Sequence, residues 1–272
     1  MKTILVPTDF SSNAYKAISY ACNMALKYKA KIILMNSFEI PTSSSKVMIN
    51  FTDLLEEDSK KGLDKELKKI RKENTFNAVN IELFSCFGSI SNAIKKAGEL
   101  YDIDLIVMGT TGESNISSRL FGSNTTNAIK SSKQPILIIP NNSIYSEWRK
   151  ITFASNIQNS KNDCPFKPLK ELITFSNSSL NILSVVEDSK SLDKIKIEGR
   201  IAAKIRGINH TINIVENESI PNGILDFIHE NDTDLLVLVK KNYGFIEGLM
   251  HTSVTRKLAL HADKPILLYS EC

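Results

Sequence analysis

The chain repeats itself at a spacing of about 130 residues, and this repeat constrains its fold more than any other feature of the sequence. Asp104-Leu-Ile-Val-Met108 corresponds in this register to Asp234-Leu-Leu-Val-Leu238. Pro135-Ile-Leu137 likewise corresponds to Pro265-Ile-Leu267, and no gap separates the two matches. Because an internal repeat marks copies of one structural unit, the sequence predicts two similar domains rather than one large domain.

The predicted domains are residues 1–141 and 149–272, and the polar stretch 141–148 joins them. Hydrophobic residues make up 42% of the 272 residues and charged residues 24%, which is ordinary for a globular protein. This composition provides enough apolar side chains for a core in each copy, and it excludes a mainly disordered chain.

Short apolar runs alternate with helical patterns through the first copy. The expected strands are 4–6, 31–38, 79–84, 105–108 and 136–139, and the expected helices are one capped by Ser11 or Ser12 and the ranges 56–72, 90–101 and 125–132. The charge run within 56–72 is interpreted as a solvated helix face. Buried strands separated by helices predict an α/β class with two tandem, doubly wound parallel sheets. Ligands of such sheets bind at the carboxyl ends of the strands.

A glycine-spaced loop follows the fourth expected strand. Gly109-Thr-Thr-Gly112 comes directly after it, and after nine intervening residues Gly122-Ser-Asn-Thr125 leads into a helix. Glycine lets the backbone approach a ligand closely, and the backbone N–H groups at the start of a helix hold phosphate oxygens. A glycine turn followed by a helix that Ser123 caps is the structural alternative.

This loop, together with Pro7-Thr8-Asp9 after the first strand, resembles the nucleotide-binding branch of the universal stress protein family. The resemblance covers both copies, and it implies Rossmann-like domains of the adenine nucleotide alpha-hydrolase-like type. It implies that the first copy binds ATP or AMP, with magnesium or manganese, where present, held by the phosphates. The implied nucleotide-binding residues are Pro7, Thr8, Asp9, Ser37, Met108, Gly109, Thr111, Gly112, Gly122, Ser123, Asn124 and Thr125.

Two residues depart from the family pattern. Thr111 stands where many nucleotide-binding members have histidine, and Asn124 stands where valine is usual. Both replacements form hydrogen bonds, so the site stays open while its choice of nucleotide is undecided. Arg119, inside the loop, is expected at the solvent-exposed surface, with a contact to phosphate as the alternative.

The second copy lacks the glycines of this loop. In the repeat register Val239, Asn242 and Thr252 replace Gly109, Gly112 and Gly122. A side chain at these positions removes the close approach that glycine permits, so we expect the second copy not to bind nucleotide. The net charge of +4 also lies within residues 1–146. The remaining replacements are Ala154 for Pro7, Asn156 for Asp9 and Glu218 for Gly88.

Several classes of function are excluded or disfavoured. The charge is too balanced to indicate nucleic acid, and no apolar run is long enough for a membrane helix. Pro7 and Asp9 interrupt any signal-peptide core, and the four cysteines form no CxxC pair, so we expect a cytoplasmic protein with unpaired thiols. His251 and His261 have no third ligand at metal-site spacing. No paired carboxylates or nucleophile–base motif indicates an enzyme.

The sequence therefore predicts a universal stress protein whose first domain binds an adenine nucleotide and regulates a stress response through an unidentified protein partner. The alternatives are an interaction or scaffold module without nucleotide and, less favoured, a slow ATP hydrolase. The expected strands 136–139 and 266–269 would pair within one chain as an internal pseudo-dimer, because each would cover the other's exposed sheet edge. A homodimer of whole chains stays open.

Overall fold

The computed structural model describes residues 1–40, 48–110, 122–155, 166–188, 194–240, 257–258 and 261–270. The chain divides into two compact units, Met1–Asn141 and Asn142–Cys272, and each is described by itself. Within the described residues no helix is both long and apolar enough to span a membrane. Cys22 and Cys86 are buried free thiols, as predicted, whereas Cys164 and Cys272 lie outside the described residues.

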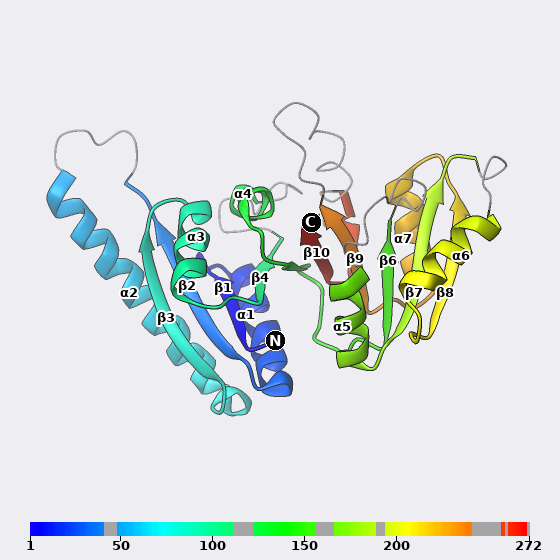
Figure 1. The fold of residues 1–272 in the computed structure, drawn as a ribbon. Helices are drawn as coiled ribbons and strands as arrows, with labels where there is room; N and C mark the ends of the chain where they lie inside the picture. The colour runs from blue at the N-terminus through cyan, green and yellow to red at the C-terminus, as the bar shows by residue number, and fades with distance from the viewer. Residues whose placement is uncertain are drawn as a thin grey trace. The chain divides into compact units, whose positions relative to one another are not determined.

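The first unit is a parallel sheet with the strand order β3-β2-β1-β4-β5 (Figure 1), which confirms the predicted α/β class. Figure 1 shows α2 and α3 on opposite sides of strands β2 and β3. The elements are β1 Thr3–Pro7, α1 Ser12–Tyr28, β2 Lys31–Phe38, α2 Met48–Lys72, η1 Asn74–Phe76, β3 Asn80–Phe87, α3 Ile90–Leu100, β4 Leu105–Gly109, α4 Ser123–Ser131 and β5 Ile136–Ile139.

Local sequence explains the first helix. The Ser11 hydroxyl accepts a hydrogen bond of 3.1 Å from the backbone N–H of Ala14, so Ser11 is the N-cap, one of the two residues predicted for it. The helix ends where Lys29 adopts a left-handed conformation with φ 53°. Its buried face carries small and apolar residues, which pack against the strands.

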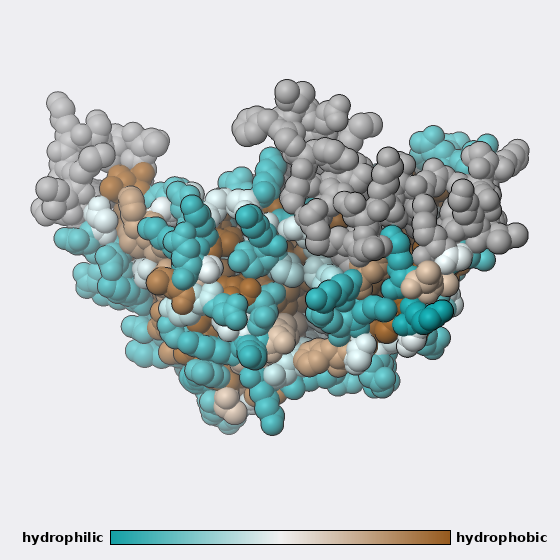
Figure 2. Space-filling view, viewed as in Figure 1, coloured by the Kyte–Doolittle hydropathy of each residue, from teal (hydrophilic) through white to brown (hydrophobic). Residues whose placement is uncertain are grey.

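Helix α2 begins at Met48 rather than at the predicted Glu56. Glycine and proline are absent from residues 48–61, so nothing in the sequence stops the helix from extending toward the N-terminus. Leu63 and Ile70 face the core, while Lys60 and Lys61 are exposed and pair with acidic residues one turn earlier. The surface along α2 is mostly hydrophilic in Figure 2, as expected of a solvated helix face.

The second unit has the same topology, with the strand order β10-β9-β6-β7-β8 and every pair parallel. The repeated strand order confirms that the two halves are copies of one fold, as the repeat predicts. The elements are β6 Lys150–Ala154, α5 Phe166–Ser176, β7 Ser179–Val186, α6 Lys194–Lys204, β8 His210–Glu216, α7 Ile220–Glu230, β9 Leu235–Lys240 and β10 Ile266–Ser270.

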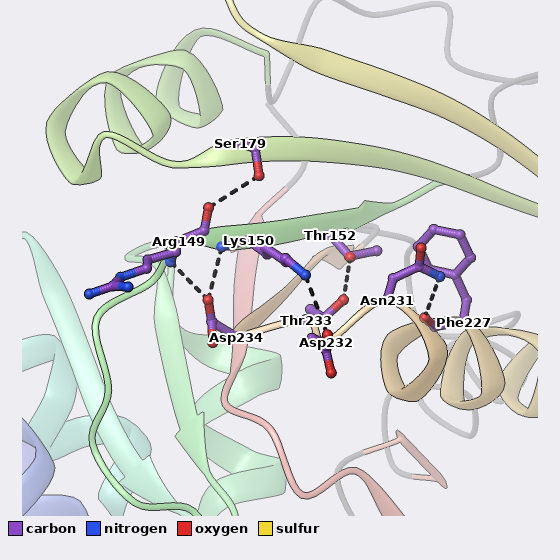
Figure 3. A network of polar contacts seen from close by, with 9 residues as sticks. All are labelled: Arg149, Lys150, Thr152, Ser179, Phe227, Asn231, Asp232, Thr233 and Asp234. Atoms are coloured by element: carbon purple, nitrogen blue, oxygen red, sulfur yellow. Dashed lines mark hydrogen bonds and ion pairs between the residues drawn. The ribbon is translucent and has the colours of Figure 1, made fainter.

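One hydrogen-bonding device is repeated in both units. Asp104, just before β4, accepts hydrogen bonds from the backbone N–H groups of Lys2 and Thr3, the latter at 3.0 Å. Its counterpart Asp234 accepts from the backbone N–H groups of Arg149 and Lys150, each at 2.9 Å (Figure 3). In each copy a carboxylate therefore joins the start of the central strand to the start of its neighbour.

We expect Asp104→Ala to lower the free energy of unfolding by about 1–2 kcal/mol, because two backbone donors lose a charged acceptor at a partly solvated position. Denaturant unfolding followed by circular dichroism measures the change. Asp102→Ala is the matched control, since Asp102 is exposed on the same loop. Equal losses in the two variants would contradict the proposed role of Asp104.

Candidate functional site

A cavity lies at the carboxyl ends of β1, β2 and β4, where the doubly wound topology places a ligand. It also takes in the start of α4. The predicted site residues that the structure describes all line it: Pro7, Thr8, Asp9, Ser37, Met108, Gly109, Gly122, Ser123, Asn124 and Thr125. Thr111, Gly112 and Arg119 lie outside the described residues.

The turn after β1 is fixed by its own side chains. The backbone N–H of Thr8 continues the ladder by donating to the carbonyl of Met35 at 2.8 Å. The Thr8 hydroxyl accepts from the N–H of Phe10 at 3.0 Å, and an Asp9 carboxylate oxygen accepts from the N–H of Ser11 at 3.1 Å. These bonds turn the chain sharply into α1 and place the Asp9 carboxylate at the cavity wall.

One threonine hydroxyl and one backbone N–H fix the start of α4 over the end of β4. The Thr125 hydroxyl donates to the carbonyl of Gly109 at 2.9 Å, and the N–H of Gly122 donates to the carbonyl of Thr110 at 3.0 Å. The Thr125 hydroxyl therefore holds α4 against β4, although Thr125 also lines the cavity. The helix begins at Ser123, two residues earlier than predicted. Ser123 is thus inside the first turn, and the alternative in which it caps the helix is wrong.

The first turn of α4 provides donors for an anion. The backbone N–H groups in the first turn of a helix have no partner within the helix, and the helix dipole adds positive potential there. Gly122 forms no side-chain cap, and its φ of −59° and ψ of 140° suit any residue. Its backbone conformation therefore does not require glycine, and the general effect of a glycine here is the close approach that a missing Cβ permits.

Sequence reasoning missed three lining residues: Ala14, Asn36 and Ile90. Asn36 is buried, donating to the carbonyl of Thr8 at 2.7 Å and accepting from the Ser59 hydroxyl at 2.7 Å. It thereby ties the turn after β1 to α2. The signal was a lone amide inside the apolar run 31–38, because a polar side chain in a buried strand needs partners.

The cavity holds about 80 Å³, well below the ~300 Å³ of common small-molecule sites. This volume accommodates a phosphate-sized group, so a larger ligand would extend beyond the cavity. Asp9 is the one titratable side chain among its described lining residues. Among the described lining residues, backbone N–H groups and hydroxyls are therefore the groups that could hold an anion.

The corresponding edge of the second unit has different chemistry. Val239 and Lys240 end β9 at the positions of Gly109 and Thr110, and Ala154 stands for Pro7. Burial lowers the pKa of Lys240 to about 8. Asn156, Asn242, Thr252 and His251 lie outside the described residues. Among the residues that are described, no group of three histidine, cysteine or acidic side chains is arranged to hold a metal.

We expect Thr125→Val to lower the free energy of unfolding by about 1–3 kcal/mol, because the buried threonine hydroxyl is lost and the Gly109 carbonyl loses its donor. Thr125→Ser keeps the hydroxyl and is the matched control. Chemical denaturation of both variants measures the difference. A valine variant as stable as the serine variant would show that this hydrogen bond does not hold α4 in place.

Comparison with known proteins identifies the fold. A model of the universal stress protein family matches residues 1–140 and 175–270. A curated universal stress protein of Methanocaldococcus jannaschii is 30% identical over 144 residues, 51% of this chain and 81% of that protein. The crystal structure of a universal stress protein from Archaeoglobus fulgidus, 18% identical, has the same fold, with a TM-score of 0.77 over 98% of both chains. The two matched segments together cover most of this chain. The chain therefore belongs to the universal stress protein family.

Proposed function

We propose that the first unit binds an adenine nucleotide, ATP or AMP, and that occupancy of the site regulates a stress response through a protein partner. One observation carries the proposal. The turn after β1, the end of β2, the end of β4 and the first turn of α4 meet around one cavity. Membership of the universal stress protein family adds support. The resemblance to that family implies both an adenine nucleotide as the ligand and the lining residues named above as its contacts.

The phosphates would lie against the first turn of α4. The backbone N–H groups of Ser123 and Asn124, together with the Ser123 hydroxyl, supply the donors there. The ribose and base would extend along the strand ends past Met108 and Ser37 toward Asp9. Mg²⁺ would be held by the phosphates, because the described lining offers it a single carboxylate.

Binding is favoured over turnover. General acid–base hydrolysis needs a second positioned group, and the described lining residues place none beside Asp9. ATP hydrolysis, where it occurs, would be slow. The second unit would contribute no nucleotide site, because Val239 places a branched side chain where the first unit has Gly109. The domain limits 1–141 and 149–272 and the pairing of strands 136–139 and 266–269 stay predictions.

The test is nucleotide binding by the full chain. Denaturing the purified protein and analysing the supernatant by mass spectrometry identifies any nucleotide that copurifies, and calorimetric titration with ATP and AMP measures affinity. We expect Gly122→Val to weaken nucleotide binding at least about tenfold, because its methyl groups would occupy the space beside the N–H groups. The φ and ψ of Gly122 suit valine, so the variant is expected to fold.

Ser131→Val is the matched control, since Ser131 is exposed at the other end of α4. It should bind nucleotide as the wild type does. No copurified nucleotide together with no heat at millimolar ATP or AMP would overturn the proposal and favour the interaction module. Equal affinity of the Gly122→Val variant and the wild type would move the site away from α4.

A further inference from the structure

The first unit contains a second and larger cavity of about 510 Å³, a volume typical of small-molecule sites. Its walls come from α2, the end of β2 and the turn after β1. Side chains alternate between the two faces of a strand, so Ser37 points to one face and Phe38 to the other. Ser37 lines the candidate nucleotide site and Phe38 lines this second cavity, while Asn36 borders both. The two cavities therefore lie on opposite sides of β2.

Apolar groups form the walls of this second cavity. Phe10, Phe38 and Leu55 line it, and Gly62 lies beneath the ring of Phe10. Phe10 has a φ of 66°, a left-handed conformation that is rare for an aromatic residue. A Cβ added at Gly62 would lie 2.4 Å from Cζ of Phe10, so the glycine makes room for the ring. These walls suit a ligand with an apolar or aromatic body.

A carboxylate among these walls has an unmet hydrogen bond. Glu66 lines the cavity with only 7% of its surface exposed, and its Oε2 atom is buried without a hydrogen-bond partner in the described structure. Its polar neighbours Asn36 and Ser59 are both satisfied, since they bond to each other. A buried polar atom without a partner is uncommon in native proteins, so the Oε2 atom of Glu66 is an acceptor to which a donor could bind.

The charges at the rim do not select a ligand. Asp58, Lys61 and Lys65 line the rim, and all three are exposed. Lys61 is already paired with Glu57 at 2.6 Å. The acidic and basic side chains at the rim nearly balance, and solvent screens them. The buried acceptor of Glu66 therefore determines which polar group of a ligand fits the cavity.

We propose that this cavity binds a small molecule in which an apolar or aromatic body carries a primary amine, with the amine donating to Oε2 of Glu66. The apolar body would pack against Phe10 and Phe38, and the amine would supply the missing hydrogen bond as a charge-assisted one. The inference does not rest on nucleotide binding, because it uses the other face of β2.

The same geometry predicts how Glu66→Gln behaves without ligand. Burial raises the pKa of Glu66, and the nearby charge of Lys69 offsets only part of this rise, so the folded state binds its proton more tightly than the unfolded state does. Glu66 therefore destabilises the wild type progressively as pH rises through the folded-state pKa. We expect Glu66→Gln to melt at or above the wild-type temperature at pH 8 and to lose that advantage toward pH 5. A lower melting temperature at pH 8 would show that the carboxylate already has a partner, which would overturn the proposal.

The binding test uses benzylamine as the probe, with benzyl alcohol as its uncharged counterpart. Ligand-detected NMR on the full chain should give a Kd for benzylamine of roughly millimolar. Glu66→Gln should weaken benzylamine binding at least about tenfold and leave the weaker binding of benzyl alcohol unchanged. Glu56→Gln is the matched control, because Glu56 pairs with Lys60 and lies outside the cavity. The expected pattern is loss in Glu66→Gln alone. Equal benzylamine binding by wild type and Glu66→Gln, or none by the wild type at about 10 mM, would overturn the proposal.

Discussion

Parallel strand pairing is the constraint on which the rest of each unit depends. Neighbouring parallel strands cannot be joined by a tight turn, so the chain returns across a face of the sheet between them. All carboxyl ends consequently meet at one edge. Residues as distant in sequence as Asp9, Ser37 and Gly122 line one cavity for this reason alone. No metal cluster among the described residues holds these side chains together, so strand pairing alone accounts for their proximity.

The two units show which interactions preserve the fold and which preserve a site. Asp104 and Asp234 make the same pair of backbone contacts, and the strand order repeats. At the carboxyl edge the correspondence ends, since Gly109 gives way to Val239 and Thr110 to the half-buried Lys240. The hydrogen bonds at the amino ends of the strands are different from those at the carboxyl ends. The carboxyl ends can therefore change while the amino ends still hold the fold together.

Much of the fold follows from the sequence because buried parallel strands are continuous apolar runs. The strands 31–38 and 136–139 were predicted to the residue for this reason. Helix limits were harder, since nothing in the sequence marks where α2 starts and Ser123 resembles a cap although it is the first helical residue. The candidate site residues could be named from the resemblance to the family, but Asn36 could not, because its role depends on Ser59, which only the packing of α2 brings near. The unmet acceptor of Glu66 has no sequence signal either, because one acidic residue among many on a charged helix looks solvated.

The contact between Phe10 and Gly62 has a consequence for how α2 finds its place. An amphipathic helix presents a similar apolar stripe at every turn, so a slip of one turn along the sheet would preserve much of its burial. The ring of Phe10 limits that freedom, because it occupies the space beside Gly62. One turn away in either direction its ring would meet Asp58 or Glu66 instead of glycine, and neither leaves the space that the missing Cβ provides. The contact between the Phe10 ring and Gly62 thus favours one alignment of the 25-residue helix over others that hydrophobicity alone would accept.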